Sequence, residues 1–183
     1  MSLMPVTVYG DSILRKVSKP IKAIDDELIE NIQDMFETMR NANGIGLAAN
    51  QVGLNKKFFI MDIHGLEEYE NFKPLVIINP EIVDYSDELI IMEEGCLSLP
   101  NLRAEVERSE IIKIKYLDTD EEVQELEADS WLARVILHEY DHLIGKMIPD
   151  RVDPRIKQKL QGDLIKIMKR DIETDYEITE RGK

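Results

Sequence analysis

The segment 138–142 reads His-Glu-Tyr-Asp-His, two histidines four residues apart with a glutamate after the first. On a helix this spacing puts the imidazoles of His138 and His142 on one face, close enough to share a metal ion. Glu139 then lies about 100° around the helix axis from His138, where its carboxylate could reach a water on the metal without binding the metal itself. The pattern therefore indicates metal-dependent hydrolysis. Because it also occurs by chance, and histidines on an apolar helix face are often only packed, a third ligand is needed elsewhere in the chain.

Cys96 is the candidate for this third ligand, since it is the only cysteine of the chain. We expect it in a glycine-flanked turn within the segment 93–100. A free cysteine is more often an inert buried residue than a ligand. Catalytic mononuclear sites, however, use three protein ligands and leave a fourth position for water, and two imidazoles with one thiolate form an available set. The further histidine of the extended zinc-protease pattern is missing, because Ile148 stands in its place.

The two histidines require a helix, and the surrounding pattern predicts one. Residues 128–143 contain no Gly or Pro, their apolar residues recur at helical spacing, and Gly145 supplies a stop signal. An earlier helix is predicted to begin at Asp25 or Asp26 and to end at the Asn-Gly pair 43–44. Its apolar stripe comprises Leu28, Ile29, Ile32, Met35, Phe36 and Met39.

Between residues 57 and 126 the pattern predicts short strands separated by turns, such as Asn79-Pro80 and the segment 118–120. The expected strands are 58–61, 75–78, 88–92, 111–116 and 122–126. Hairpins without an intervening helix favour antiparallel pairing. We therefore predict an α+β fold, with antiparallel or mixed sheets around the central metal-binding helix, an N-terminal helix and a C-terminal helix. In the polar loop 64–74, His64 is expected at the surface without a partner.

Composition is that of a soluble globular protein. The 183 residues, 43% of them hydrophobic, suit a single domain over 1–183, in which residues 1–3 could be an expression leader and 151–183 a C-terminal helix and tail. No apolar run is long enough to span a bilayer, and one cysteine cannot form an internal disulfide, so we expect a cytoplasmic protein without a membrane partner. A formal net charge of −14 argues against general nucleic-acid binding.

Charge is uneven along the chain. The segment 151–170 holds seven Lys or Arg against two Asp, a local charge of +5. The usual explanation is a solvated helix face, and the alternative is a docking element. The residues expected to pack this helix on the body are Ile156, Leu160, Leu164, Ile165 and Met168.

The segment 44–53 (Gly-Ile-Gly-Leu-Ala-Ala-Asn-Gln-Val-Gly) has small residues and almost no charge. Such a segment suits the close approach of a ligand or another strand to its backbone, although a tight packing turn is the more common explanation. It is a poor phosphate-binding loop, because the third spaced glycine and the lysine are missing. Gln51 and Asn50 are its polar side chains that could donate to a substrate oxygen.

Three segments together resemble one family, peptide deformylase. Residues 44–51 resemble its GxGxAAxQ motif, residues 94–98 (Glu-Gly-Cys-Leu-Ser) its EGCxS motif, and residues 138–142 its HExDH motif, in the family's order and with its typical spacing. Each motif alone is modest in specificity, whereas the ordered triple is highly specific. The resemblance extends from about residue 8 to at least Arg151.

The resemblance implies an enzyme that removes the formyl group from the N-terminal formylmethionine of new proteins and releases formate. Cys96, His138 and His142 would hold the metal, which lowers the pKa of its bound water, and Glu139 would be the general acid/base. The side chain of Gln51 and the backbone N–H of Leu97 would stabilise the oxyanion. Family members use Fe(II) natively, one ion per chain, and Ni(II), Co(II) or Zn(II) can substitute.

The resemblance also implies how the substrate binds. The peptide of a formylmethionyl nascent chain would lie as an added strand against residues 44–46 and 95–97. Arg134 departs from the family's apolar pocket lining and bears on side-chain preference. The basic segment 151–170 could meet the ribosome near the nascent-chain exit. The expected substrate-binding residues are Gly44, Ile45, Gly46, Met92, Gly95, Leu97, Arg108 and Val135, of which Ile45, Met92, Leu97 and Val135 would form the methionine pocket and Arg108 would hold a nearby carboxylate or carbonyl.

Two other classes of protein remain as alternatives. A zinc endopeptidase would share the histidine pair but take a carboxylate or an imidazole as third ligand, so the change Cys96→Ala would leave metal binding intact. A structural or redox-sensing metal site would have its fourth position filled by the protein and would catalyse nothing. The small number of additional soft ligands in the chain disfavours this second alternative.

Overall fold

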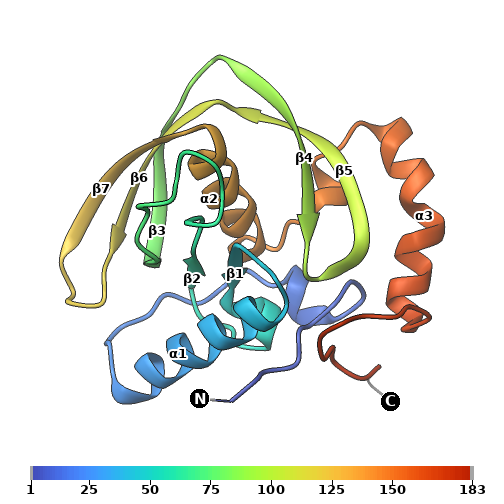
Figure 1. Cartoon of the computed structure of the whole chain (residues 1–183), viewed down its shortest axis with the longest axis horizontal. Helices are drawn as coiled ribbons and strands as arrows, with labels where there is room; N and C mark the ends of the chain where they lie inside the picture. Colours follow the sequence, from blue (N-terminus) through green and yellow to red (C-terminus); the bar gives the residue numbers. More distant parts are fainter. Residues whose placement is uncertain (1, 182–183) are drawn as a thin grey trace.

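The computed structural model describes residues 2–181, which form two antiparallel sheets and three α-helices joined by loops and short 3-10 helices (Figure 1). The helices are α1 (Asp26–Asn41), α2 (Ser130–Leu143) and α3 (Pro154–Lys169). The strands are β1 (Gly46–Ala48), β2 (Phe58–Met61), β3 (Leu75–Tyr85), β4 (Leu89–Cys96), β5 (Leu99–Ser109), β6 (Ile111–Leu117) and β7 (Val123–Asp129).

The larger sheet has five strands in the order β1-β2-β3-β6-β7, and β4 and β5 pair as a second sheet. Every neighbouring pair of these strands is antiparallel. Helix α2 occupies the centre of the molecule, while α3 lies beside β5 at the edge (Figure 1). This arrangement confirms the predicted α+β fold, with antiparallel sheets around the central helix that carries residues 138–142.

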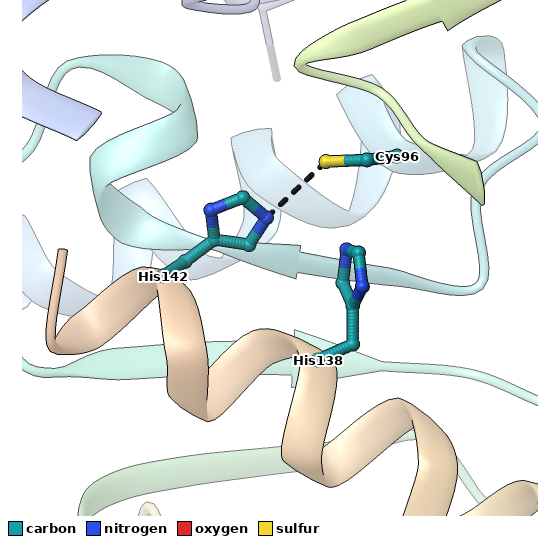
Figure 2. A group of neighbouring side chains, drawn as sticks. All are labelled: Cys96, His138 and His142. Carbon is teal, nitrogen blue, oxygen red and sulfur yellow. Dashed lines mark hydrogen bonds between the residues drawn. The ribbon is translucent and has the colours of Figure 1, made fainter. Parts of the chain in front are cut away.

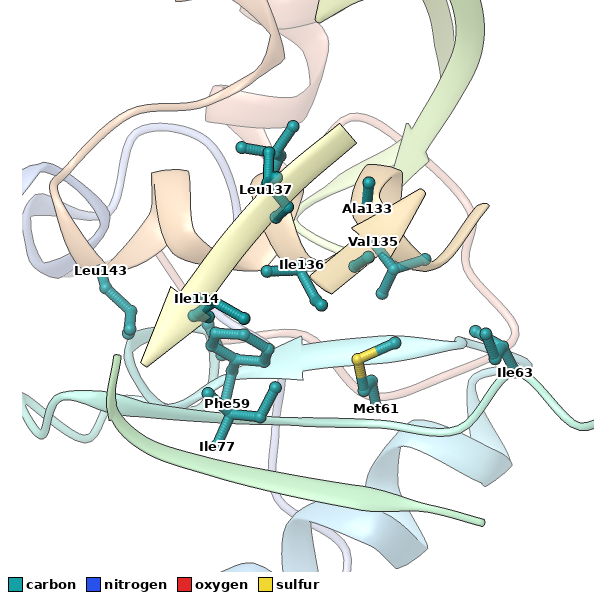
Figure 3. Close-up of a cluster of buried hydrophobic side chains, with 13 residues drawn as sticks. Phe59, Met61, Ile63, Ile77, Ile114, Ala133, Val135, Ile136, Leu137 and Leu143 are labelled. Atoms are coloured by element: carbon teal, nitrogen blue, oxygen red, sulfur yellow. The ribbon is translucent and has the colours of Figure 1, made fainter. Parts of the chain in front are cut away.

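An apolar face of α2 packs on the larger sheet and fixes the helix in place (Figure 3). Ile136 of α2 and Phe59 of β2 are both fully buried in this core cluster. Burial of a side chain of this size contributes about 1.5–3 kcal/mol. The cluster also contains Met61, Ile63, Ile77, Ile114, Ala133, Val135, Leu137 and Leu143.

The start of α1 and the end of α2 follow from local sequence, whereas α1 ends at Asn41, before the predicted Asn-Gly pair 43–44. The Asp25 carboxylate accepts a hydrogen bond of 2.9 Å from the Leu28 N–H, which confirms the N-cap of α1. Helix α2 ends at Leu143, and Gly145 follows with a φ of 73°. A Cβ at Gly145 would lie 2.6 Å from the Arg15 carbonyl oxygen, so this position needs glycine for conformation and for space.

The turn predicted at Asn79-Pro80 is wrong, because β3 runs through it. Asn79 has a φ of 50°, and the register with β6 shifts between Ile78 and Glu81. A bulge of this kind tolerates proline within a strand. The Asn79 side chain accepts a hydrogen bond from the Ile21 N–H and donates one to the Ile21 carbonyl oxygen, both at 2.8 Å.

Strand β5 was absent from the predicted strands, and β4 is longer than expected. Cys96 therefore ends a strand, and only Leu97 and Ser98 separate it from β5. Burial alternates along β5, with Leu102, Ala104 and Val106 inside. This period of two is the signal from which the strand β5 could have been predicted.

Helix α3 packs on the body, as predicted, through Ile156, Leu160 and Leu164, but Ile165 and Met168 do not belong to the packed stripe. Leu164 and Ile167 are buried, with Ile156 and Leu160 partly buried beside them. Ile165 and Met168 are instead 43% and 38% exposed. The spacing 156, 160, 164, 167 follows one face of a helix, whereas Ile165 lies off it.

One loop prediction also needs correction. His64 has a partner, since its Nδ1 lies 2.6 Å from Asp62 Oδ1, although its side chain is 64% exposed as expected. Most of the loop 64–74 is exposed, while Leu66, Tyr69 and Phe72 pack against the core cluster. Of the expected leader 1–3, Met1 lies outside the described residues, and the backbone N–H of Ser2 donates to Asp34 at 2.7 Å. Within residues 2–181, no helix has the length and apolar character needed to cross a membrane.

Candidate active site

Cys96, His138 and His142 come together between the end of β4 and helix α2 (Figure 2). One ligand atom from each residue lies within 4.8 Å of the other two. Cys96 Sγ is 3.2 Å from His142 Nε2, and the two imidazole rings are 5.0 Å apart at an angle of 76°. The structure thus unites the three predicted ligands, which are 46 residues apart in the chain at the most.

These residues fit a transition-metal ion. Two imidazole nitrogens and one thiolate form a donor set that such ions prefer. Burial, followed by the nearby His138, lowers the pKa of His142 well below its ordinary value, which keeps the ring neutral as a ligand must be. Burial also lowers the pKa of His138, but Cys96 and Glu94 more than offset it and leave it raised. Positive charge is therefore favoured between Cys96 and Glu94, and a metal cation bound by Cys96 and His138 would supply it.

Glu94 orients His138, a role that the sequence did not reveal. Its Oε2 lies 2.9 Å from His138 Nδ1, which leaves Nε2 of that ring for the metal. Arg108 donates to both oxygens of Glu94, at 2.6 and 3.0 Å, and to Asp141 at 2.7 Å. Arg134 donates to Glu94 at 2.9 Å and to two backbone carbonyls at 2.8 Å. This buried network joins β4, β5 and α2.

Burial raises the Glu94 pKa by itself, but the hydrogen bonds from His138 and Arg108 outweigh it and hold the pKa well below its ordinary range. Arg108 therefore holds carboxylates of the protein itself, and it does not line the active-site cavity. The predicted role of Arg108 in holding a nearby carboxylate fits this geometry. Its predicted role in binding the substrate does not.

Glu139 is buried beside Cys96, His138 and His142, and its Oε2 has no hydrogen-bond partner among the described residues. Burial raises the pKa of this carboxyl to about 7. A side chain at Gly46 would collide with the Glu139 carboxylate, so glycine there gives this group its space. A carboxyl with such a pKa and a free oxygen is suited to accept and return a proton near neutral pH.

Gln51 is held with its amide N–H toward Cys96. Its Oε1 accepts a hydrogen bond of 2.8 Å from the Ala48 N–H, which fixes the orientation of the amide. Its Nε2 then donates to Ser98 Oγ at 3.1 Å and approaches Cys96 Sγ at 3.5 Å. A donor fixed in this way costs little reorganisation when an oxyanion forms.

A cavity of about 630 Å³ opens over these groups. Met92, predicted in the methionine pocket, does not line it. It lies on the same face of β4 as Glu94 and Cys96 but farther along the strand from the site. The predicted residues that do line it are Gly44, Ile45, Gly46, Gln51, Gly95, Cys96, Leu97, Val135, His138 and Glu139.

Other residues of the site were not predicted. Trp131, Arg103 and Tyr176 line the cavity. Asn50 was expected as a possible donor to a substrate oxygen, but it does not line the cavity, and its side chain donates to the His142 carbonyl oxygen at 2.6 Å. For Trp131 the helical period from Val135 was an available signal. Tyr176 lies 79 residues from the nearest partner of its hydroxyl, so no local pattern could have placed it.

The family model of polypeptide deformylases matches residues 3–158. The chain belongs to the peptide deformylase family. The peptide deformylase of Chlorobium phaeovibrioides is 42% identical over 174 residues, covering 95% of this chain and 91% of that protein. The peptide deformylase of Rickettsia typhi is 48% identical over 153 residues, covering 82% and 87%. A crystal structure of peptide deformylase from Thermotoga maritima superposes with a TM-score of 0.78 at 43% identity, covering 84% of this chain and 100% of that chain.

Peptide deformylases are metal-dependent hydrolases that remove the N-formyl group from nascent peptides, and this chain shares that activity. The resemblance inferred from the three motifs is thus confirmed. The cluster of Cys96, His138 and His142 offers the deformylase a place for its metal.

Proposed function

We propose that Cys96, His138 and His142 hold the catalytic metal and that Glu139 is the general acid/base of deformylation. The observation that carries the proposal is the buried Glu139 oxygen without a partner, beside three ligand atoms within 4.8 Å of one another. The orientation of His138 by Glu94 supports the ligand role, because metal-binding histidines usually give their other nitrogen to a carboxylate.

A bound metal lowers the pKa of water and polarises the formyl carbonyl. Glu139 takes a proton from the attacking water as the new carbon–oxygen bond forms at the formyl carbon. The carbon–nitrogen bond then breaks, and Glu139 returns the proton to the leaving amine. The products are formate and a peptide with a free N-terminal methionine. The pKa of about 7 suits Glu139 to both proton transfers.

The Gln51 amide and the Leu97 backbone N–H would stabilise the oxyanion formed from the formyl oxygen. The hydrogen bond from Ala48 to Gln51 Oε1 directs the Gln51 N–H groups toward Cys96, which supports this role. Loss of one such donor typically costs about 10²- to 10³-fold in rate.

The substrate peptide would bind as an added strand along residues 44–46 and 95–97, both of which line the cavity. Because pairing of this kind involves the main chain, the enzyme would not discriminate between most side chains of the substrate. Ile45, Leu97 and Val135 would form apolar walls for the methionine side chain. The guanidinium of Arg134 is committed to Glu94 and two carbonyls, so we expect it to support the pocket without demanding an acidic substrate.

The native ion would be Fe(II), with Ni(II), Co(II) or Zn(II) as substitutes, one ion per chain. We further propose that the chain is a single domain that works in the cytoplasm. The single cysteine, which cannot form an internal disulfide, is consistent with a reducing compartment. The basic helix α3 would then meet the ribosome that carries the nascent substrate.

The decisive assay compares a formylmethionyl peptide with the same peptide lacking the formyl group. We expect formate and a free amine from the first peptide, and no cleavage of an internal bond in either. The change Cys96→Ala should abolish metal binding. Retention of the metal by this variant, with internal cleavage by the wild type, would favour the endopeptidase alternative.

A further inference from the structure

The C-terminal tail, residues 171–181, leaves α3 and returns beneath β4 and β5 toward the N-terminal segment (Figure 1). It lies beyond residues 3–158, the part that the family model matches. Asn101 Nδ2 donates to the Glu173 carbonyl oxygen at 3.0 Å. The Val6 N–H donates to the Glu177 carbonyl oxygen, and the Thr179 N–H donates to that of Val6, both at 2.9 Å. The tail is therefore anchored on both sides of residue 176.

Tyr176 extends from this anchored tail into the active-site cavity. Its hydroxyl donates to the Leu97 carbonyl oxygen at 2.8 Å, and its side chain lines the cavity with Cys96 and Leu97. Burial, followed by the charge of Cys96, raises the pKa of this phenol, so its hydroxyl is a donor near neutral pH.

The turn that Tyr176 contacts is the two-residue connection from β4 to β5. The register of these strands shifts between Gly95 and Cys96, so the strand ladder does not hold the carbonyls of this turn. The Leu97 carbonyl is bound by Tyr176, and the Ser98 carbonyl accepts from the Tyr9 N–H at 2.9 Å. Contacts from the two ends of the chain thus fix this turn.

We propose that Tyr176 is a positioning residue for deformylation, acting through Leu97. The Leu97 carbonyl and the Leu97 N–H belong to two successive planar peptide units that are joined at the Leu97 Cα, so a held carbonyl limits the rotation of one unit relative to the other. The Leu97 N–H, the proposed oxyanion donor, is thereby kept in its catalytic orientation, next to the ligand Cys96. The inference rests on the proposed role of Leu97. An ordinary wall residue would contribute contact area but would not need its hydroxyl.

The test compares Tyr176→Phe with Tyr116→Phe, a matched loss of a phenol on β6, away from the cavity. Amide hydrogen exchange of residues 95–100 is measured on metal-free protein, and kcat and KM on nickel-loaded protein with a formylmethionyl peptide. We expect Tyr176→Phe to speed exchange about 3- to 10-fold and to lower kcat by a similar factor, with KM within about twofold. Tyr116→Phe should change neither quantity.

Thr179→Ala adds an independent check, because the Thr179 hydroxyl lies 2.5 Å from Asp11 Oδ2 and helps to anchor the tail. This variant should lower kcat less than Tyr176→Phe does and should have no further effect when combined with it. Faster exchange without a fall in kcat, or a fall in kcat without faster exchange, would overturn the positioning role. A rise in KM alone would make Tyr176 a substrate-contact residue instead. An inactive wild type would refute the proposed function itself.

Discussion

Glu139 is the side chain on which the proposed proton transfers depend. The change Glu139→Gln keeps its shape but removes the base, so we expect full metal content and a loss of about 10²- to 10⁴-fold in kcat. Metal analysis and formate release measure the two quantities. Glu125→Gln, at a carboxylate 71% exposed on β7, is the control and should change neither. A Glu139→Gln protein without metal would show instead that Glu139 is a ligand.

Cys96 bears on which metal works best. Zinc exceeds ferrous iron in the Irving–Williams order, so affinity should favour zinc. An open Fe(II) position beside a thiolate, however, invites oxidation of the sulfur by oxygen. We expect iron enzyme prepared without air to be the most active and to decay in air, nickel enzyme to be nearly as active and stable, and zinc enzyme to be slow. Formate release is compared at equal metal occupancy, and a zinc form as fast as the iron form would contradict the assignment.

Glu94 should make stability depend on pH in one direction. Its pKa is depressed in the folded state, so its contribution is fully present above the unfolded value of 4.5 and is lost progressively as pH falls from there through the lower folded value. The change Glu94→Gln should lower the free energy of unfolding by about 3 kcal/mol at pH 7, because Arg108 and Arg134 would lose the buried carboxylate with which they pair. Urea unfolding from pH 7 to 3 measures this. A difference between variant and wild type that grows on acidification would contradict the assigned direction.

Residue types and spacing sufficed to single out Cys96, His138, His142 and Glu139, which the structure brings together, because each belongs to a local motif. They could not reveal the partners that orient them. Glu94 and His138 are 44 residues apart, and Tyr176 and Leu97 are 79 apart. Such contacts depend on how strands and helices pack, which no short pattern encodes.

Helix α2 holds the site only as firmly as its apolar face is packed. Ile136 is fully buried against the larger sheet, so Ile136→Ala should cost about 2–5 kcal/mol in free energy of unfolding. Ile165→Ala on α3 is the matched control, and its 43% exposure predicts a change within about 0.5 kcal/mol. Denaturant unfolding of both proteins gives the comparison. Equal losses of stability in the two variants would mean that the face of α3 that carries Ile165 is covered in solution.

Helices were easier to predict than strands in this chain. The cap at Asp25 and the stop at Gly145 are local signals, and both operate as expected. The wrong strand predictions rested on turn residues alone. Asn79-Pro80 forms a bulge within β3, and the alternation in β5 was overlooked although its period indicated a strand.

At the scale of the molecule, charge is distributed unevenly between α3 and the rest of the chain. Two of the seven basic residues in 151–170 pair with the body, since Arg151 donates to Asp141 at 3.0 Å and Arg170 contacts Asp11. The others are exposed: Arg155, Lys157, Lys159, Lys166 and Lys169. The positive surface is thus smaller than the sequence count suggested, but it lies on one helix of a chain with a net charge of −14.

If this helix meets ribosomal RNA, binding must weaken with salt, because each phosphate contact releases counterions. We expect the protein to pellet with ribosomes at low salt and to be released at high salt. Lys157→Glu with Lys159→Glu should weaken binding and lower the salt slope by about two. Lys19→Glu with Lys22→Glu, both exposed near the N-terminus, makes the same change in net charge and should leave binding nearly intact. Docking through α3 would be refuted if the protein did not pellet with ribosomes, or if its binding ignored salt and survived removal of residues 151–183. Equal losses of ribosome binding in the two double variants would mean that binding depends only on net charge.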